Sequence, residues 1–136
     1  MAFLDWSSDY SVGVAIFDDE HKKLIAIINS LYEAIHAGID DDALSRITDA
    51  MVEYTIMHFR HEEMYFDDWA YPDAAAHIQA HGALRQQVMD FRGQVGGTDR
   101  HKLAEEMLTF LRQWLIQHIQ VDDRAYGEFL FDKGVR

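Results

Sequence analysis

The chain of 136 residues is 49% hydrophobic, which is enough for one domain with a substantial core. Acidic residues outnumber basic ones by 24 to 12, and the formal charge of −12 argues against binding nucleic acid or an anionic membrane, because both need clustered cations. The absence of cysteine excludes disulfides, iron–sulfur clusters, thiolate zinc sites and cysteine nucleophiles.

The N-terminus has neither the basic start nor the long apolar run of a signal peptide, since it reads Met1-Ala2-Phe3-Leu4-Asp5. The longest purely aliphatic stretch, Leu24 to Ile28, is far too short to span a bilayer. These features predict a cytoplasmic protein with no membrane partner.

Four long segments carry the apolar periodicity of amphipathic helices, and a short fifth one follows. We expect the long helices at about 18–37, 41–66, 72–94 and 99–120, and the short one at about 124–131. Gly38 is a suitable C-terminal stop for the first helix, and Asp40 to Asp42 offer N-cap groups for the second. Pro72 suits the first turn of the third helix, and Thr98 or Asp99 can cap the fourth.

Helices of this length, about 20 residues, extend roughly 30 Å each. Because short turns join them, the pattern predicts an all-α fold, an up-down-up-down antiparallel four-helix bundle. An N-terminal arm and the short C-terminal helix complete it. No linker, repeat or low-complexity stretch indicates a second domain, so residues 1–136 are expected to form one domain.

Five of the eight histidines fall on the apolar faces of these helices. They are His21 in the first helix, His58 in the second, His77 and His81 in the third, and His118 in the fourth. Glu62 follows His58 by four residues and therefore lies on the same face, as His81 does relative to His77. In an antiparallel bundle the starts and ends of alternating helices meet, so all five imidazoles converge on one level.

A single inward histidine is more often a hydrogen-bonded core residue than a metal ligand. Five of them with an inward carboxylate are different, because each unsatisfied buried group costs roughly 1–3 kcal/mol. Metal coordination removes that cost and is the better interpretation. Five imidazoles exceed the needs of one site that keeps an open position, which favours two bridged metals. Nitrogen-rich donors with some carboxylate suit iron, copper, zinc or nickel and not magnesium or calcium.

Glu62 is the first candidate for a carboxylate that bridges the two metals. The second bridge is expected near His118, where Asp122 and Asp123 follow. Regular helix spacing favours Asp122, four residues on, but the position is close to the helix end and spacing alone leaves both residues as candidates.

Taken together, these residues resemble the hemerythrin family, in particular its single-domain bacterial members, over essentially the whole chain. The matching motifs are Val12-Gly13-Val14, Phe17-Asp18-Asp19-Glu20-His21-Lys22, His58-Phe59-x-x-Glu62-Glu63, Tyr71-Pro72, His77-x-x-x-His81, Trp114-x-x-x-His118-Ile119 and Asp123. Their combined spacing is highly specific, although each motif alone is weak evidence. Three positions depart from the family pattern: Glu20 replaces a glutamine, Phe66 replaces a frequent methionine, and His61 is an additional histidine inside a motif.

The resemblance implies a di-iron centre with an unequal distribution of ligands. One iron would be bound by His77, His81 and His118, and the iron with an open position by His21 and His58. The bridges between the two ions would be Glu62, Asp123 and an oxo or hydroxo group.

The resemblance thus selects Asp123 as the second bridge, against the spacing of a regular helix. Because Asp123 lies five residues after His118, the chain is expected to bend or unwind there. The resemblance also implies that Trp114 and Leu115 line the oxygen pocket, with Tyr126 near it.

The function implied is reversible dioxygen binding at the iron with two histidines, for oxygen storage, delivery or sensing. A monomer without catalytic activity and without an obligatory protein partner is expected. The main alternative is a di-iron oxidase, peroxidase or ferroxidase, but neither Glu62 nor Glu63 begins the Glu-x-x-His motif of such bundles. The residues are also compatible with a nitric-oxide-binding protein or a zinc-stabilised interaction module. The remaining histidines, His36, His61 and His101, are expected not to bind metal.

Overall fold

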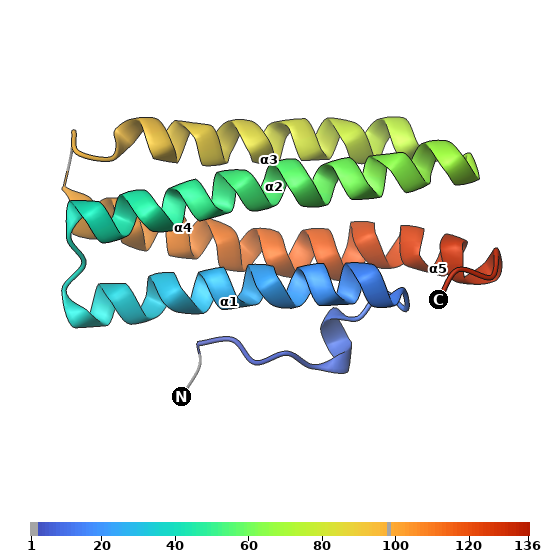
Figure 1. Ribbon diagram of the computed structural model, residues 1–136, viewed down its shortest axis with the longest axis horizontal. Helices are drawn as coiled ribbons and strands as arrows, with labels where there is room; N and C mark the ends of the chain where they lie inside the picture. Colours follow the sequence, from blue (N-terminus) through green and yellow to red (C-terminus); the bar gives the residue numbers. More distant parts are fainter. Residues whose placement is uncertain (1–2, 98) are drawn as a thin grey trace.

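The computed structural model describes residues 3–97 and 99–136, without the side chains of residues 115 and 116. Every regular element in these residues is helical. The elements are, in chain order, η1 (Ser8–Tyr10), α1 (Ala15–Ala37), α2 (Asp41–Trp69), α3 (Ala74–Gln94), α4 (Arg100–Trp114), η2 (Leu115–Asp123) and α5 (Arg124–Asp132). Figure 1 shows that successive helices from α1 to α4 run in opposite directions, which confirms the predicted antiparallel bundle.

Cap geometry confirms three of the predicted helix ends. Gly38 ends α1 in the left-handed conformation, at a φ of 86° that costs glycine nothing. The carboxylate of Asp40 accepts a hydrogen bond from the N–H of Ala43 at 2.7 Å and caps α2. Asp99 accepts hydrogen bonds from the N–H groups of residues 101 and 102 and caps α4, whereas Thr98 lies outside the described residues.

The turn between α2 and α3 differs from the prediction. α2 continues beyond residue 66 to Trp69 and α3 begins only at Ala74, so Pro72 lies in the turn and not inside the third helix. Ala70 has a left-handed φ of 52°, and the next N–H, of residue 71, bonds back to the carbonyl of Phe66 at 3.0 Å. The C-terminal cap of α2 therefore sets this turn, and the proline only follows it.

The helix ends also differ from the prediction at both ends of the chain. α1 begins at Ala15 instead of residue 18. The fourth helix does not stop near residue 120 before a separate short helix. Instead, α4, the π-helix η2 and α5 form one continuous helical run from Arg100 to Asp132. A change of pitch within this run, and not a break, positions the residues of the site.

The N-terminal arm lies along α1, as Figure 1 shows in blue. The side chain of Asn29 fixes the arm through two hydrogen bonds of 2.8 Å, one from the N–H and one to the carbonyl of Leu4. Further along, Val12 packs on Gly127 of α5 so closely that a Cβ at residue 127 would lie 2.1 Å from the Val12 carbonyl oxygen. The arm therefore joins the first helix to the last.

The interior of the bundle has two different halves. The half near the α1–α2 turn contains apolar side chains such as Leu31, Leu44 and Met107, which are completely buried. The other half contains most of the buried polar side chains, which include all five predicted histidine ligands and both predicted bridges. The site is therefore built into one half of the core and not onto the surface.

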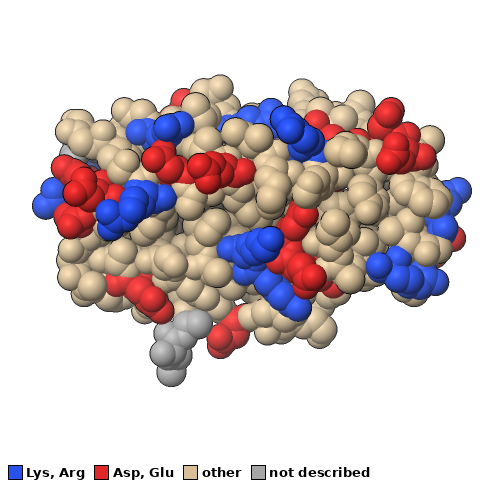
Figure 2. Space-filling model, in the orientation of Figure 1, with Lys and Arg blue, Asp and Glu red and all other residues tan. Residues whose placement is uncertain are grey.

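Acidic and basic side chains are interspersed on the surface. Figure 2 shows Lys and Arg next to Asp and Glu on one face of the molecule, without gathering into one patch. Some of them form ion pairs between neighbouring helices, as Arg92 and Asp49 do with a 2.9 Å distance from Nε to Oδ1. Among the described helices, none has both the length and the apolar character to cross a membrane.

Candidate metal centre

Seven buried side chains bring their nitrogen and oxygen atoms together in two overlapping groups. Within each group the potential ligand atoms all lie within 4.8 Å of one another. The first group consists of Glu62, His77, His81, His118 and Asp123, and the second of His21, His58, Glu62 and Asp123. These are the seven residues that the family resemblance implies as metal ligands. They come from α1, α2, α3 and η2, so each of the four antiparallel helical runs contributes.

The π-helix explains how Asp123 reaches the site. Its wider turn places Asp123 on the same face of the helix as His118, although Asp123 lies five residues later. Oδ1 of Asp123 lies 3.1 Å from Nε2 of His118. Of the two expectations, a bend or an unwinding, the structure shows the second, in the form of a π-helix. Asp122, which a regular helix would favour, has a side chain 44% exposed and lies 3.4 Å from the other ring nitrogen of His118.

Asp123 divides its two oxygens between the groups. Oδ1 lies 2.8 Å from Nε2 of His77 and 3.1 Å from Nε2 of His118, both in the first group. Oδ2 lies 3.1 Å from Nε2 of His21 in the second group. The carboxylate therefore faces two sets of imidazoles with different oxygens.

Glu62 divides its oxygens in the same way. Oε1 lies 2.9 Å from Nε2 of His81, whereas Oε2 lies 3.3 Å from Nε2 of His58. In addition, the Nε2 atoms of His21 and His58 face each other at 3.2 Å. Both acidic side chains common to the two groups thus stand between them.

The donor atoms suit transition-metal ions. Both oxygens of Glu62 and of Asp123 are buried and lack a hydrogen-bond partner among the described residues, as does Nε2 of the three histidines in the first group. Two neighbouring ligands at about 2.1 Å from one ion lie about 3 Å apart when the angle between them is near 90°. The observed separations of 2.8 to 3.3 Å fit such a ligand shell. Imidazole with carboxylate suits iron, copper, zinc or nickel.

In the metal-free protein, opposite charges compensate each other inside the site. Burial and the charge of Asp123 raise the pKa of Glu62, but the neighbouring imidazoles outweigh them and hold the pKa at about 2. Burial lowers the pKa of His58, but the charge of Glu62 and a hydrogen bond to Glu20 raise it to about 10. The same balance, with Asp123 as main partner, raises the pKa of His118 to about 10.

A carboxylate holds the outward-facing nitrogen of three of the five histidines. The Nδ1 atoms of His58, His81 and His118 lie 2.5, 3.0 and 3.4 Å from the carboxylates of Glu20, Glu63 and Asp122, respectively. Such partners fix the orientation of an imidazole and leave Nε2 for a metal.

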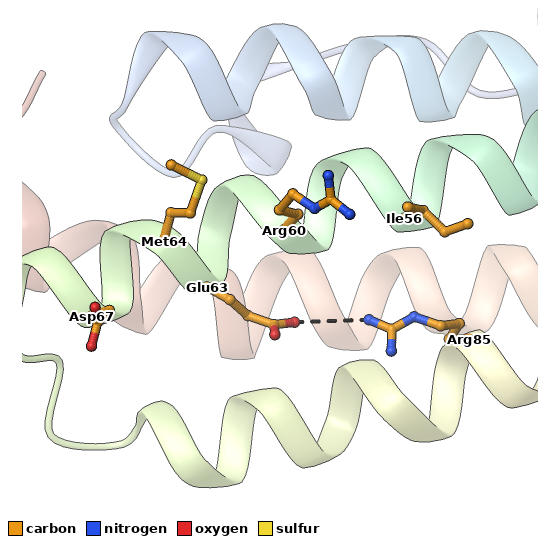
Figure 3. Close-up of a pocket in the computed structure, with 6 residues that line it drawn as sticks. All are labelled: Ile56, Arg60, Glu63, Met64, Asp67 and Arg85. Atoms are coloured by element: carbon orange, nitrogen blue, oxygen red, sulfur yellow. Dashed lines mark ion pairs between the residues drawn. The ribbon is translucent and has the colours of Figure 1, made fainter.

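Figure 3 shows that Glu63 projects from α2 towards Arg85 of α3, whose Nη2 lies 3.9 Å from Oε2. These two residues line a surface groove together with Arg60 and Met64. The partner of His81 is therefore in contact with solvent, and an arginine stands beside it.

Aromatic rings pack against the imidazoles of the first group. Phe59 stacks on His81 with ring centroids 3.9 Å apart and an interplanar angle of 6°. Trp114, expected to line the oxygen pocket, stacks on His118 with centroids 5.3 Å apart. Leu115, for which the same role was expected, has a side chain outside the described residues.

Two buried tyrosines flank the site. Tyr126 is completely buried, and its ring packs edge-on against His77 with centroids 5.6 Å apart. Tyr54 stacks on His58 with centroids 5.2 Å apart. Burial and the charge of Glu62 raise the pKa of both phenols, so both stay neutral. Tyr54 was not predicted as a site residue, although its position four residues before His58 could have indicated it.

The other three histidines, which were expected not to bind metal, lie apart from the two donor groups of the described residues. His36 and His101 are exposed, and His61 belongs to neither donor group. The sequence did not reveal, however, that Glu20 is buried and contacts both His58 and His61. Glu20 points about 100° away from His21 around its own helix, so only the packing of α1 against α2 brings about this contact.

The sequence is similar to those of known proteins. The model of the family described as "Hemerythrin HHE cation binding domain" matches residues 12–130. A bacteriohemerythrin of Stenotrophomonas maltophilia is 33% identical over 94% of this chain and 82% of its own. A bacteriohemerythrin of Methylococcus capsulatus is 28% identical over 96% of this chain and 98% of its own.

A comparison with solved structures also finds hemerythrins. The crystal structure of a wild-type hemerythrin superimposes with a TM-score of 0.81 and 27% sequence identity, and the match covers 93% of this chain and 97% of the other. The family model covers most of the chain, and the first relative exceeds 30% identity over most of both chains. The chain therefore belongs to the hemerythrin family.

Proposed function

We propose that the seven donors bind two iron ions and that the protein binds dioxygen reversibly. His77, His81 and His118 would hold one iron, and His21 and His58 the other. Glu62 and Asp123 would bridge them, together with an oxo or hydroxo group. The single observation that carries this proposal is that each of the two carboxylates directs one oxygen to each set of imidazoles.

The unequal distribution of histidines indicates where an external ligand binds. With the bridges shared equally, the second group offers one imidazole fewer than the first. An ion held by His21 and His58 would therefore have a position free of protein ligands, as metal sites that bind small molecules do. When bound, a pair of ferrous ions supplies the two electrons that dioxygen binding requires.

The protein's own contribution is to keep this position dry. The imidazoles are at most 6% exposed. The rings of Phe17, Tyr54 and Phe59 pack against His58 of the second group, whereas Trp114 and Tyr126 pack against His118 and His77 of the first. We propose that Trp114, Leu115 and Tyr126 line the oxygen pocket. A dry pocket slows the entry of water and anions, and this favours release of the bound gas over irreversible oxidation.

The donor set supports binding in preference to turnover. Di-iron bundles of the glutamate-rich type combine four carboxylates with Glu-x-x-His motifs, whereas here the two groups contain five imidazoles and two carboxylates. Glu33 and His36 do have the Glu-x-x-His spacing, but both are outside the site. Oxygen storage, delivery or sensing is therefore the role that we propose.

The test is an oxygenation cycle on the protein loaded anaerobically with ferrous iron. We expect two iron ions per chain, an absorbance change when oxygen is admitted, and return to the starting spectrum when oxygen is removed. Absorbance that does not reverse would contradict reversible binding. Sustained consumption of a reductant or of ferrous iron under air would indicate an oxidase, a peroxidase or a ferroxidase instead, and a protein isolated with zinc alone would indicate an interaction module.

A further inference from the structure

Glu20 connects a site histidine to the surface of the molecule. It precedes His21 on α1, but its side chain reaches across to α2 and is only 6% exposed. Oε1 accepts a hydrogen bond from Nδ1 of His58 at 2.5 Å, and Oε2 accepts one from Nδ1 of His61 at 2.6 Å. Because the side chain of His61 is 40% exposed, the chain of hydrogen bonds ends in solvent.

We propose that Glu20, itself held by His61, is the positioning residue that fixes His58 as a ligand of the two-histidine ion. This inference rests on the proposed di-iron centre. With Nδ1–H donated to Glu20, the lone pair of a neutral His58 lies on Nε2. That atom faces the shared carboxylate of Glu62 at 3.3 Å, where the ion is expected.

His61 completes the arrangement, because a buried carboxylate needs a partner for each oxygen. Without His61, the second oxygen of Glu20 would be buried without a side-chain donor, and the carboxylate would be free to turn away from His58. This gives a role to the additional histidine of the His58–Glu62 motif, which does not join either donor group.

The second ion depends on this arrangement more than the first. At the first ion, Glu63 and Asp122 hold His81 and His118 from partly exposed positions. At the second ion, Nδ1 of His21 has no hydrogen-bond partner among the described residues, so His58 is the one imidazole there with an outer carboxylate. Two adjacent residues of α1 therefore contribute to the second group: His21 is one of its imidazoles, and Glu20 holds the other, His58.

The first experiment measures iron per chain and the rate of iron removal by a chelator for variants of the protein loaded with ferrous iron. Loss of an outer partner weakens metal binding roughly 10- to 100-fold. We expect Glu20→Ala to retain about one iron per chain, and His61→Ala to lose its second iron faster than the wild type. Glu20→Gln is expected to retain both ions, because its amide oxygen can still accept a hydrogen bond from Nδ1–H of His58.

His101→Ala is the matched control, because His101 is also a surface histidine paired with a glutamate, Glu105, at 3.0 Å, but lies outside the site. It should behave as the wild type. If Glu20→Ala unfolds, His61→Ala tests the same arrangement without removing a buried group. If Glu20→Ala folds and retains both ions as the wild type does, the inference is overturned. If Glu20→Ala does not fold, the same result in His61→Ala overturns it.

A second readout does not depend on iron or oxygen. In the diamagnetic protein loaded with zinc, the Nδ1–H of His58 should give a downfield, slowly exchanging proton resonance, which Glu20→Ala abolishes and Glu20→Gln keeps. A resonance unchanged in Glu20→Ala would overturn the inference even if oxygen binding proves reversible. Conversely, irreversible oxygenation of a wild type that shows this resonance would contradict the proposed function and leave the role of Glu20 intact.

Discussion

Asp122 and Asp123 are adjacent in sequence but lie in opposite environments. Asp123 is completely buried with both oxygens directed at imidazoles, whereas Asp122 reaches only the outer nitrogen of His118 from a partly exposed position. The difference arises from the π-helix, since a regular helix would exchange the two positions. Of the two, only Asp123 can present one oxygen to each proposed ion.

Asp123→Asn is therefore expected to lose at least one of the two iron ions per chain. An amide has one oxygen that can bind a metal, and the other half of the group carries hydrogen atoms towards His21 or His77. Iron per chain after gel filtration measures this. Asp122→Asn is the matched control and should keep both ions. Equal iron content in the two variants would show that Asp123 is not a bridge.

The pKa shifts predict how the metal-free protein responds to pH. The folded pKa of about 10 for His58 and His118 lies above the ordinary 6.5, so their contribution to stability is complete below pH 6.5 and is lost as the pH rises through 10. The folded pKa of about 2 for Glu62 lies below the ordinary 4.5, so its contribution is complete above pH 4.5 and is lost as the pH falls through 2.

The free energy of unfolding of the metal-free protein should therefore be greatest between about pH 4.5 and 6.5. Denaturant titrations at several pH values measure it. In the protein loaded with metal, the free energy of unfolding should not decline above pH 6.5, because the imidazoles are then bound to metal in their neutral form. A metal-free protein equally stable at pH 6 and pH 10 would contradict the charge pairing in the site.

At the level of single residues, the sequence predicted the donors but not what holds them. Spacings of four residues placed His58 with Glu62 and His77 with His81, because one helix carries both members of each pair. The partner of His58 is Glu20, on another helix, and that contact depends on how two helices are rotated against each other. Spacing within one helix contains no information on that rotation.

Among the helices, η2 is the one whose form could not be predicted from spacing. Residues 115–123 have no proline or glycine that marks a change of pitch. The π-helix forms where the five-residue interval between His118 and Asp123 must fit a single face, and α5 then continues without a break. The family resemblance supplied the interval, and the bend or unwinding expected from it takes the form of local unwinding into a π-helix.

Gly127 limits how α5 can pack. A Cβ there would lie 2.1 Å from the Val12 carbonyl oxygen, so Gly127→Ala must push the arm and α5 apart, and we expect a loss of roughly 1–3 kcal/mol. Gly82 on α3 has no atom within 4 Å of its Cβ position. Gly82→Ala should instead stabilise the protein by about 0.5–1 kcal/mol. Thermal unfolding of both variants measures the two changes in stability. A loss of stability in Gly82→Ala would contradict the expectation that its Cβ position is free.

On the scale of the whole molecule, the proposed ions act as cross-links. Their ligands come from α1, α2, α3 and η2, so one cluster ties the four antiparallel helices together. The topology itself was predictable because four long periodic segments joined by short turns allow few arrangements. That the site lies in one half of the bundle also followed from the sequence, since the ends of alternating helices meet.

Removal of metal should therefore lower the melting temperature considerably. An ion present at a thousand times its dissociation constant stabilises the folded state by about 4 kcal/mol. At roughly 3 °C per kcal/mol for a chain of this size, loss of that ion would lower the midpoint by about 10 °C. Calorimetry with and without a chelator measures this. Magnesium, which does not suit imidazole, should not restore the midpoint, and an unchanged midpoint after metal removal would argue against the cross-link.

The division of the core into an apolar half and a polar half has a consequence for local opening. Leu31, Leu44 and Met107 hold the apolar half together by packing alone, whereas the other half depends on the balance of charges around Glu62 and Asp123. When metal leaves, amide protons near the site should exchange with solvent faster, while those near the α1–α2 turn keep their protection. The apolar half would then persist as a folded template on which the helices realign, so that metal can return without refolding of the whole chain.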